Sequence, residues 1–456
     1  MRKNKVRSKV TILVGLLITL AVFLSGCWDR REIEELSMVA GLAIDCEENT
    51  STPYKEGSIS NKEEQMEFDK EKQLQIIVTQ QYIVPKAVSG GEKGGTSQKS
   101  PYANVSVDGN SIYEIMQKFE NINSRTPNYE HLRVIIISDK AARYFNLYKL
   151  LNAILRHPET PRNIDMLVSE RKACSILDIA PRSEDIPAFK LMMLVRKTKS
   201  KSGTPSVSTL GDMSKAMAAG KSFVIQRVGF RQDIGSEYDT VKISDSNYNN
   251  LANINKTSGM NFIYDSGTKG LASGMGDIIE AVGAAVIKGQ TYNMTGWLNR
   301  SETDALNWIT GKVEEGSVEF KESKSSETIV YDVDRVKTKI KPEILEGKIS
   351  FTVDMKMEGT LVEDWLMTAD AFKEEFIKDM EMNAEKEVRR ILEKTLEKLQ
   401  KELKTDVAGF GKQLSIKYPR YWNDIKDNWE EIFSDVPINL DLKVYIRDFG
   451  RQGSKK

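Results

Sequence analysis

Hydrophobic and polar residues alternate along two segments in the last third of the chain. Every second residue is apolar in residues 349–357 and again in residues 438–446. Within each segment, most of the residues at the alternate positions are polar or charged. A strand with this pattern has one buried face and one solvated face, which is typical of antiparallel sheets. We therefore predict a C-terminal antiparallel sheet.

A long stripe of apolar residues lies between these two segments. From Phe372 to Leu403 apolar residues recur every three or four positions, and the pattern stops before Gly409. This spacing predicts one amphipathic helix of about 35 residues. Because the flanking strands need an apolar cover, we expect the helix to pack on the sheet. A free coiled coil is the alternative use of the stripe.

The first half of the chain mixes apolar runs with helical periodicity. The runs that predict buried strands are residues 38–44, 73–84, 132–137 and 164–168. Apolar residues at helical spacing predict helices at 111–121 and 140–155. Alternating strands and helices indicate a sheet covered by helices. The fold predicted for the whole chain is α+β and multidomain, with mixed and antiparallel sheets covered by helices.

Composition suggests where the domains divide. We predict an N-terminal α/β domain at residues 27–200, a middle α+β domain at 201–320 and a C-terminal domain at 321–456, with the sheet and the long helix. Residues 240–276 are rich in Ser, Asn, Gly and Asp, so we expect a flexible insertion in the middle domain. Residues 85–104 contain two Gly pairs and predict a second surface loop.

A basic run precedes the first domain boundary. Arg196, Lys197, Lys199 and Lys201 lie just before Ser, Gly, Thr and Pro residues. We interpret this run as a solvated linker between domains. Contact with anionic lipid headgroups is the alternative.

The N-terminus has the three parts of a bacterial lipoprotein signal. Five basic residues and no acidic ones lie in residues 1–9, and residues 10–23 form an uncharged apolar run. Leu24-Ser25-Gly26-Cys27 follows at once and matches a lipobox, whose Cys receives a diacylglyceryl group on sulfur. We predict a signal peptide at residues 1–26 and lipidation at Cys27, whose freed amine is a second position for acylation. An uncleaved N-terminal helix is the alternative.

Composition narrows the chemistry that the chain can perform. Its 456 residues include 66 Lys and Arg, 66 Asp and Glu, two His and three Cys. Balanced charge gives no basic field for nucleic acid, and two His are too few for multi-His metal sites. We expect no cofactor and no metal. Cys46 and Cys174 could pair in an oxidising compartment, although two free thiols are the preferred interpretation.

Motifs for catalysis are incomplete. Gly220-Lys221-Ser222 resembles the end of a phosphate-binding loop, but the Gly required five positions earlier is Lys215. His131 and His157 lie beside a predicted strand and a helix end, where a structural role is the simpler interpretation. We therefore predict no catalytic residues and no enzymatic activity.

The residues after the lipobox carry a resemblance to a known family. The opening Cys27-Trp28-Asp29, the later Gly109-Asn110-Ser111 and Tyr129-Glu130-His131, and the C-terminal Gly409-Phe410-Gly411 followed by Trp422 occur in the order that this family shows. On these motifs the chain resembles the Ger(x)C family, the C-subunit lipoproteins of spore nutrient germinant receptors.

The resemblance implies a function that the residues alone do not give. It implies a lipid-anchored receptor subunit in spore germination, on the outer face of the spore inner membrane beside membrane subunits A and B, with a scaffolding or coupling role. A lipid-anchored solute-binding protein of a transporter is one alternative, although that class has two similar lobes. An envelope hydrolase that uses carboxylates is another.

Overall fold

The computed structural model describes most of the chain outside its N-terminus and a few connecting segments. The described residues are Gly15, 35–48, 74–84, 100–179, 184–198, 203–205, 209–230, 279–312, 316–321, 327–364 and 374–449. The predicted signal peptide at 1–26, Cys27 and the predicted insertion at 240–276 lie outside them, apart from Gly15. No helix within these ranges is both long and apolar enough to cross a membrane.

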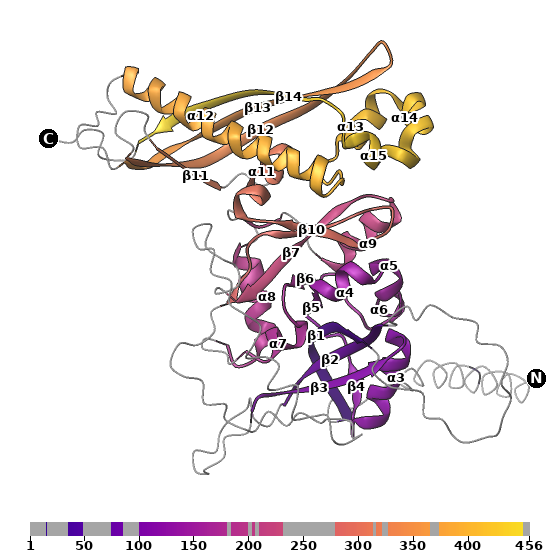
Figure 1. Ribbon diagram of the computed structural model, residues 1–456. Helices are drawn as coiled ribbons and strands as arrows, with labels where there is room; N and C mark the ends of the chain where they lie inside the picture. Colours follow the sequence, from indigo (N-terminus) through magenta and orange to yellow (C-terminus); the bar gives the residue numbers. More distant parts are fainter. Residues whose placement is uncertain are drawn as a thin grey trace, which may run out of the picture.

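A ten-stranded sheet forms the N-terminal body (Figure 1). Its strands are β1 (Leu36–Glu48), β2 (Leu74–Ile83), β3 (Tyr102–Gly109), β4 (Thr126–Asn128), β5 (Val134–Ser138), β6 (Asp165–Ser169), β7 (Phe223–Phe230), β8 (Ile279–Glu280), β9 (Ala284–Ile287) and β10 (Met294–Leu298). The main order is β10-β9-β7-β6-β5-β1-β2-β3. The centre of the sheet is parallel and consists of β7, β6, β5 and β1. The two sides are antiparallel: β2 pairs with β1 and β3 with β2 on one side, and β9 pairs with β7 and β10 with β9 on the other.

Helices bury both faces of this sheet. The helices on one face are α3 (Ile112–Ile122), α4 (Asp139–Tyr144), α5 (Leu147–Leu150), α6 (Asn152–Arg156) and α9 (Leu210–Ala218). The helices on the other face are α7 (Ala173–Leu177) and α8 (Pro187–Thr198). Strand β1 illustrates burial on both faces. Its residues Leu42 and Ile44 lie in the core with the first group of helices, and Ala40 and Ala43 lie in the core with the second group. A strand buried on both faces has a continuous apolar run, as residues 38–44 have.

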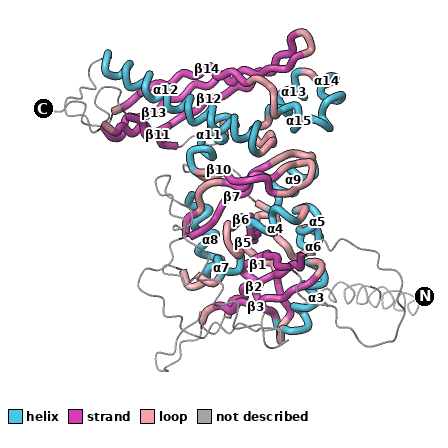
Figure 2. The backbone as a smooth tube through the Cα atoms, in the orientation of Figure 1, coloured by secondary structure: helices cyan, strands magenta, loops and turns pink. Residues whose placement is uncertain are grey.

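A four-stranded sheet with helices on it forms the C-terminal layer (Figure 2). Its strands are β11 (Gly316–Lys321), β12 (Thr328–Leu345), β13 (Lys348–Asp364) and β14 (Ile438–Asp448). Its helices are α11 (Arg300–Thr310), α12 (Glu374–Glu397), the π-helical turn η3 (Lys398–Glu402), α13 (Phe410–Lys417), α14 (Pro419–Ile425), the 3₁₀ turn η4 (Lys426–Asn428) and α15 (Trp429–Phe433). The predicted α+β fold is confirmed.

The long helix packs as predicted. Met380, Ala384, Val388 and Leu392 of α12 are buried in one core with the apolar faces of β12, β13 and β14. Burial of the stripe inside the chain leaves it unavailable for a coiled coil. At about 25 cal/mol per Å² of apolar surface, this burial is a main source of stability for the layer.

The C-terminal sheet is mixed, not wholly antiparallel as we predicted. Strands β11, β12 and β13 pair antiparallel, but β14 pairs parallel to β13, with Phe351 opposite Ile438. Strand β14 is parallel to β13 because α12 carries the chain back along the sheet, so that β14 begins at the same end as β13. Alternating polarity shows that a strand has one wet face but does not give its direction.

Two other predictions need correction. Residues 140–155 form not one helix but α4, α5 and α6, because the chain leaves the helix at Phe145 and Asn146, whose backbone is extended. The predicted loop at 85–104 includes the start of β3, since Tyr102–Asn104 pairs with β2. The domain boundary at residue 200 stays a prediction, and the strands on its two sides, β6 and β7, pair directly in one sheet.

Candidate functional site

The predicted lipidation site precedes the central region of the N-terminal sheet. Cys27 itself is outside the described part of the chain, and β1 begins at Leu36, nine positions later. An extended chain of that length spans at most about 30 Å. Strand β1 pairs with β2 on one side and with β5 on the other. An anchor at Cys27 would therefore hold the body through a strand that has partners on both sides.

The thiols of Cys46 and Cys174 are free; the first is buried and the second partly buried. Cys46 is buried at the end of β1, and Cys174 lies partly buried in α7. Burial raises the pKa of Cys46 to about 11 and that of Cys174 to about 12. The carboxylate of Asp45 accepts hydrogen bonds from the backbone N–H groups of Ala173 (2.7 Å) and Cys174 (2.9 Å). These groups tie α7 to β1, and neither thiol has the low pKa of a nucleophile.

The two histidines do not form a ligand cluster. His157 ends α6 and packs edge-on against the Tyr129 ring, with 5.0 Å between centroids. His131 is partly buried in the turn before β5. Among the described residues, His, Cys, Asp and Glu side chains nowhere gather in a group of three or more that could hold a metal ion.

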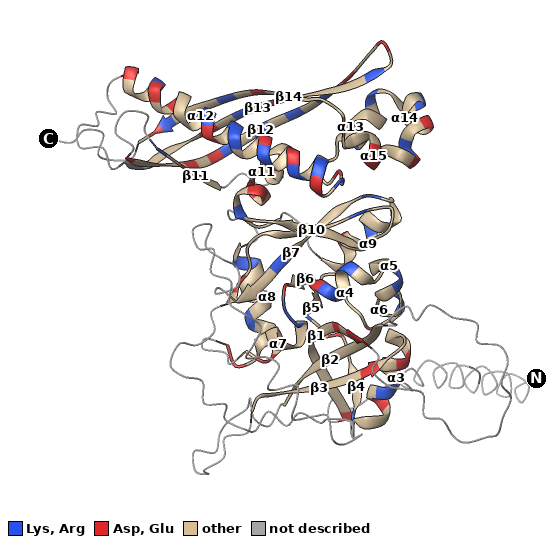
Figure 3. Cartoon of the chain, viewed as in Figure 1, with Lys and Arg blue, Asp and Glu red and all other residues tan. Residues whose placement is uncertain are grey.

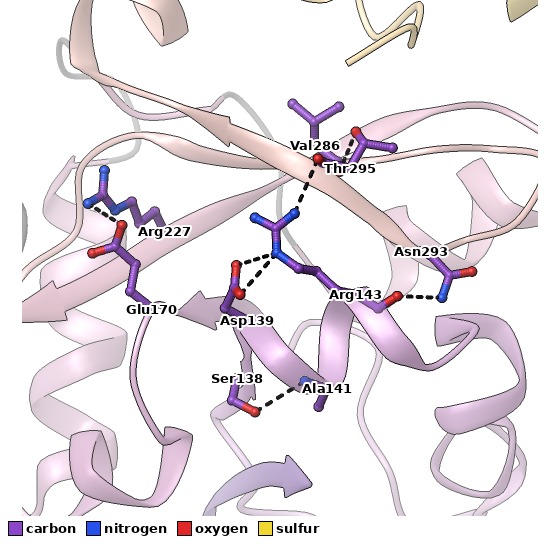
Figure 4. Close-up of polar contacts among 9 residues, drawn as sticks. All are labelled: Ser138, Asp139, Ala141, Arg143, Glu170, Arg227, Val286, Asn293 and Thr295. Atoms are coloured by element: carbon purple, nitrogen blue, oxygen red, sulfur yellow. Dashed lines mark hydrogen bonds and ion pairs between the residues drawn. The ribbon is translucent and has the colours of Figure 1, made fainter. Parts of the chain in front are cut away.

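Polar side chains gather where the parallel strands β5 and β6 end, the usual ligand-binding edge of an α/β sheet (Figure 4). Asp139 pairs with Arg143 at 2.9 Å, and Arg143 also donates to the Thr295 carbonyl of β10 at 3.2 Å. Glu170 pairs with Arg227 at 2.6 Å. These two ion pairs cross-link the edge, although Nε of Arg227 and the Ser169 hydroxyl are buried there without a hydrogen-bond partner among the described residues.

Polar side chains also meet at the junction between the two sheets. We call Ser222, Glu302, Lys398, Asp406 and Glu430 the polar joint. The Ser222 hydroxyl, before β7, donates to Glu430 of α15 at 2.5 Å, and the other Glu430 oxygen accepts the Asp406 N–H at 2.7 Å. Lys398 of η3 pairs with Glu302 of α11 at 2.7 Å. These contacts join segments far apart in sequence.

Asp406 organises the C-terminal side of the joint. Its carboxylate accepts the backbone N–H groups of Gly409, Phe410 and Gly411, at 2.7, 3.1 and 2.7 Å, and the indole N–H of Trp429 at 2.9 Å. The carboxylate thus satisfies the free N–H groups at the start of α13. Four donors on one carboxylate fix its position strongly.

The Gly-Phe-Gly motif has a packing explanation. A Cβ on Gly411 would lie 2.6 Å from Nε1 of Trp429 and 2.7 Å from Cη2 of Trp422. Phe410 is fully buried between Phe351 and Phe433. The motif therefore seats α13 against the aromatic core of the layer.

Sequence reasoning missed the polar joint. Ser222 was noticed only within an incomplete phosphate-loop motif, where Gly220 ends the turn after α9 with a φ of +62°. One signal was available: the acidic Asp406 lies shortly before Gly409, the residue that precedes α13, and negative charge is favourable near a helix N-terminus. Its pairing with Glu430 depends on the tertiary fold.

Comparison with known proteins gives consistent matches over both parts of the chain. The family models for the spore germination protein N-terminal domain and for "Spore germination B3/ GerAC like, C-terminal" match residues 29–229 and 282–450. Among Bacillus subtilis (strain 168) proteins, spore germination protein YndF is 30% identical, with 98% of each chain covered, and spore germination protein A3 is 28% identical, with 98% of this chain and 100% of that protein covered. The crystal structure of the GerBC protein covers 82% of this chain and 94% of its own, with a TM-score of 0.51 at 22% identity. That structural match supports the fold.

Proposed function

This chain belongs to the GerAC-like family of spore germination proteins, and from that premise we propose that it is a lipid-anchored subunit of a spore nutrient germinant receptor. The observation that carries the proposal is similarity over 98% of both chains to spore germination protein YndF. Similarity of that extent includes the N-terminal body and the C-terminal layer together.

The anchor is the acylated sulfur of Cys27. The lipobox Leu24-Ser25-Gly26-Cys27 supports it, after a basic segment and an apolar run of signal-peptide length. One acyl chain binds a bilayer weakly and two bind it firmly, at about 0.8 kcal/mol per buried CH₂. The diacylglyceryl group supplies two chains, and the anchor holds the body at the outer face of the spore inner membrane.

The role is to connect membrane partners, without catalysis. Anchoring confines the protein to two dimensions, so interfaces of moderate affinity with receptor subunits A and B are sufficient. The polar joint supports a coupling role, because it links the anchored N-terminal body to the C-terminal layer through partly buried contacts such as Ser222–Glu430. A movement of the N-terminal body can then displace the C-terminal layer with it as a rigid unit.

Replacement of the lipidated thiol tests the anchor. Cys27→Ala should leave a folded protein that leaves the membrane fraction and supports nutrient-triggered germination poorly. Cys174→Ala is the matched control, because it removes a thiol from the body and should keep the membrane location. Unchanged fractionation of Cys27→Ala would refute the anchor, and normal germination of spores that carry it would refute its importance.

Affinity capture tests the receptor assignment. The native protein is solubilised from spore membranes in detergent, captured, and the proteins that accompany it are identified. Receptor A and B subunits are the expected partners. A permease with an ATPase in their place would favour the solute-binding alternative.

A further inference from the structure

A groove of about 650 Å³ lies between the first half of α12 and the end of β14. The helix side carries the carboxylates of Glu375, Asp379, Glu381 and Glu385, and the strand side is residues 443–445. Figure 3 shows that acidic and basic residues follow one another along α12. A groove between a helix and a strand edge is a site where other proteins bind extended peptides.

The outer edge of β14 is partly open. Within the described chain β14 is the last strand of its sheet and pairs with β13 alone. Side chains of α12 satisfy two groups on the outer edge, since Arg389 donates to the Leu440 carbonyl (3.0 Å) and Glu381 accepts the Ile446 N–H (2.9 Å). Backbone groups of alternate residues point the same way, so those of Leu442 and Val444 also face outward.

These two side-chain contacts define a window on the edge. Between Leu440 and Ile446, no strand of the described residues pairs with the outward groups of Leu442 and Val444. Such an edge can accept another strand. The neighbouring groove provides room for the side chains of that strand.

Charge and spacing indicate what kind of strand fits. Four carboxylates line the groove against two ammonium groups, Lys378 and Lys443, and Lys378 already pairs with Glu374 at 2.6 Å. Glu375 and Asp379 are four positions apart on the helix, a rise of about 6 Å. Alternate residues of an extended strand are about 6.7 Å apart. Lys or Arg at alternate positions of a strand would therefore match the carboxylates.

We propose that the groove between α12 and β14 binds an extended basic segment of a partner protein, which adds to the outer edge of β14. Backbone hydrogen bonds to Leu442 and Val444 hold the segment, and the carboxylates of Glu375 and Asp379 select its basic side chains. Met382, 62% exposed, supplies apolar contact in the groove. This site does not depend on the anchor at Cys27.

Peptide binding to the full chain in detergent tests the charge requirement. The probe is a fluorescent peptide of about ten residues in which Lys and Thr alternate. The control peptide has Glu in place of every Lys. The basic peptide should bind, and the double variant Glu375→Lys/Asp379→Lys should weaken binding by about tenfold or more. The control Glu393→Lys/Glu397→Lys makes the same charge change further along α12 and should alter affinity by no more than about twofold. Equal binding of the acidic peptide, or no effect of the groove variant, would overturn the proposal.

Hydrogen exchange tests whether the bound peptide forms a strand. The basic peptide should slow exchange of the Leu442 and Val444 amides and leave the amides of β12 unchanged. Binding without protection in β14 would overturn strand addition.

A photo-reactive amino acid in place of Met382 identifies the natural occupant in native membranes. A cross-linked basic peptide from another protein supports the proposal. Three results would overturn the proposal. They are cross-links only to residues 450–456 of this chain or to a second copy, cross-links to an acidic segment, and no cross-links at all.

Discussion

Glu302 of α11 and Lys398 of η3 form an ion pair of 2.7 Å across the polar joint, and only 4% of the Glu302 side chain is exposed. The same Glu302 carboxylate accepts the Asn299 N–H at the start of α11. The pair thus connects the helix that follows the N-terminal sheet with the π-helical turn at the end of α12. Such turns often lie at functional positions.

Loss of one partner of this pair should destabilise the layer. Lys398→Met leaves Glu302 charged and buried, and we expect the free energy of unfolding to fall by about 3 kcal/mol. The measurement is urea unfolding followed by tryptophan fluorescence. Lys401→Met is the matched control, since its pair with Asp435 is exposed on both sides and should contribute less than about 1 kcal/mol. A loss for Lys398→Met no larger than the control's would contradict a buried, stabilising pair.

A methyl group at Gly411 should disturb the aromatic core. Gly411→Ala places Cβ against Trp429 and Trp422, and the rings must shift. We expect a loss of about 1–3 kcal/mol in the free energy of unfolding, together with a change in the near-UV circular dichroism of the tryptophans. Ser415→Ala, on the same helix, should cost less than about 0.5 kcal/mol. An unchanged spectrum for Gly411→Ala would show that the two rings do not pack against this residue.

Stability of the polar joint should depend on pH through Glu430. Burial raises the pKa of this carboxyl, although hydrogen bonds from Ser222 and Asp406 oppose the shift. A raised pKa in the folded state means that the contribution of Glu430 is full below its unfolded pKa and is lost as pH rises through the folded value. The native protein should therefore become more stable, relative to Glu430→Gln, as the pH is lowered from about 7 to about 5.

The measurement is the urea midpoint of each protein at both pH values. Glu431→Gln is the control, because it removes a charge from the exposed neighbour of Glu430. The same difference between native protein and Glu430→Gln at both pH values would contradict the predicted proton linkage.

Local pattern was enough to predict most elements but not their pairing. Residues 38–44 lie in β1, and the predicted strands at 132–137 and 164–168 overlap most of β5 (Val134–Ser138) and β6 (Asp165–Ser169), since a strand buried on both faces needs a continuous apolar run. The stripe from Phe372 to Leu403 predicted one helix of about 35 residues, and the described helix is shorter, because α12 ends at Glu397 and the π-helical turn η3 ends at Glu402. The direction of β14 was wrong because a strand's own residues carry no information on which way its neighbour runs.

The joint was beyond sequence reasoning for a related reason. Ser222 and Glu430 are 208 positions apart, and Glu302 and Lys398 are 96 apart. Each looks like an ordinary surface residue in its own segment. Their burial follows from the way the two sheets pack, which no window of neighbouring residues contains. The lipidation of Cys27, the domain boundaries and the receptor partners stay predictions.

The place of β1 in its sheet has a mechanical consequence for a tethered molecule. Force on a tether at Cys27 enters the folded body at Leu36. Leu36–Met38 pairs with β4, and further along the strand β1 pairs with β2 from Val39 and with β5 from Gly41, so several ladders share the load. A tether on an edge strand would instead be able to peel that strand away. Tension on the proposed tether would thus be borne by an interior strand of the ten-stranded sheet.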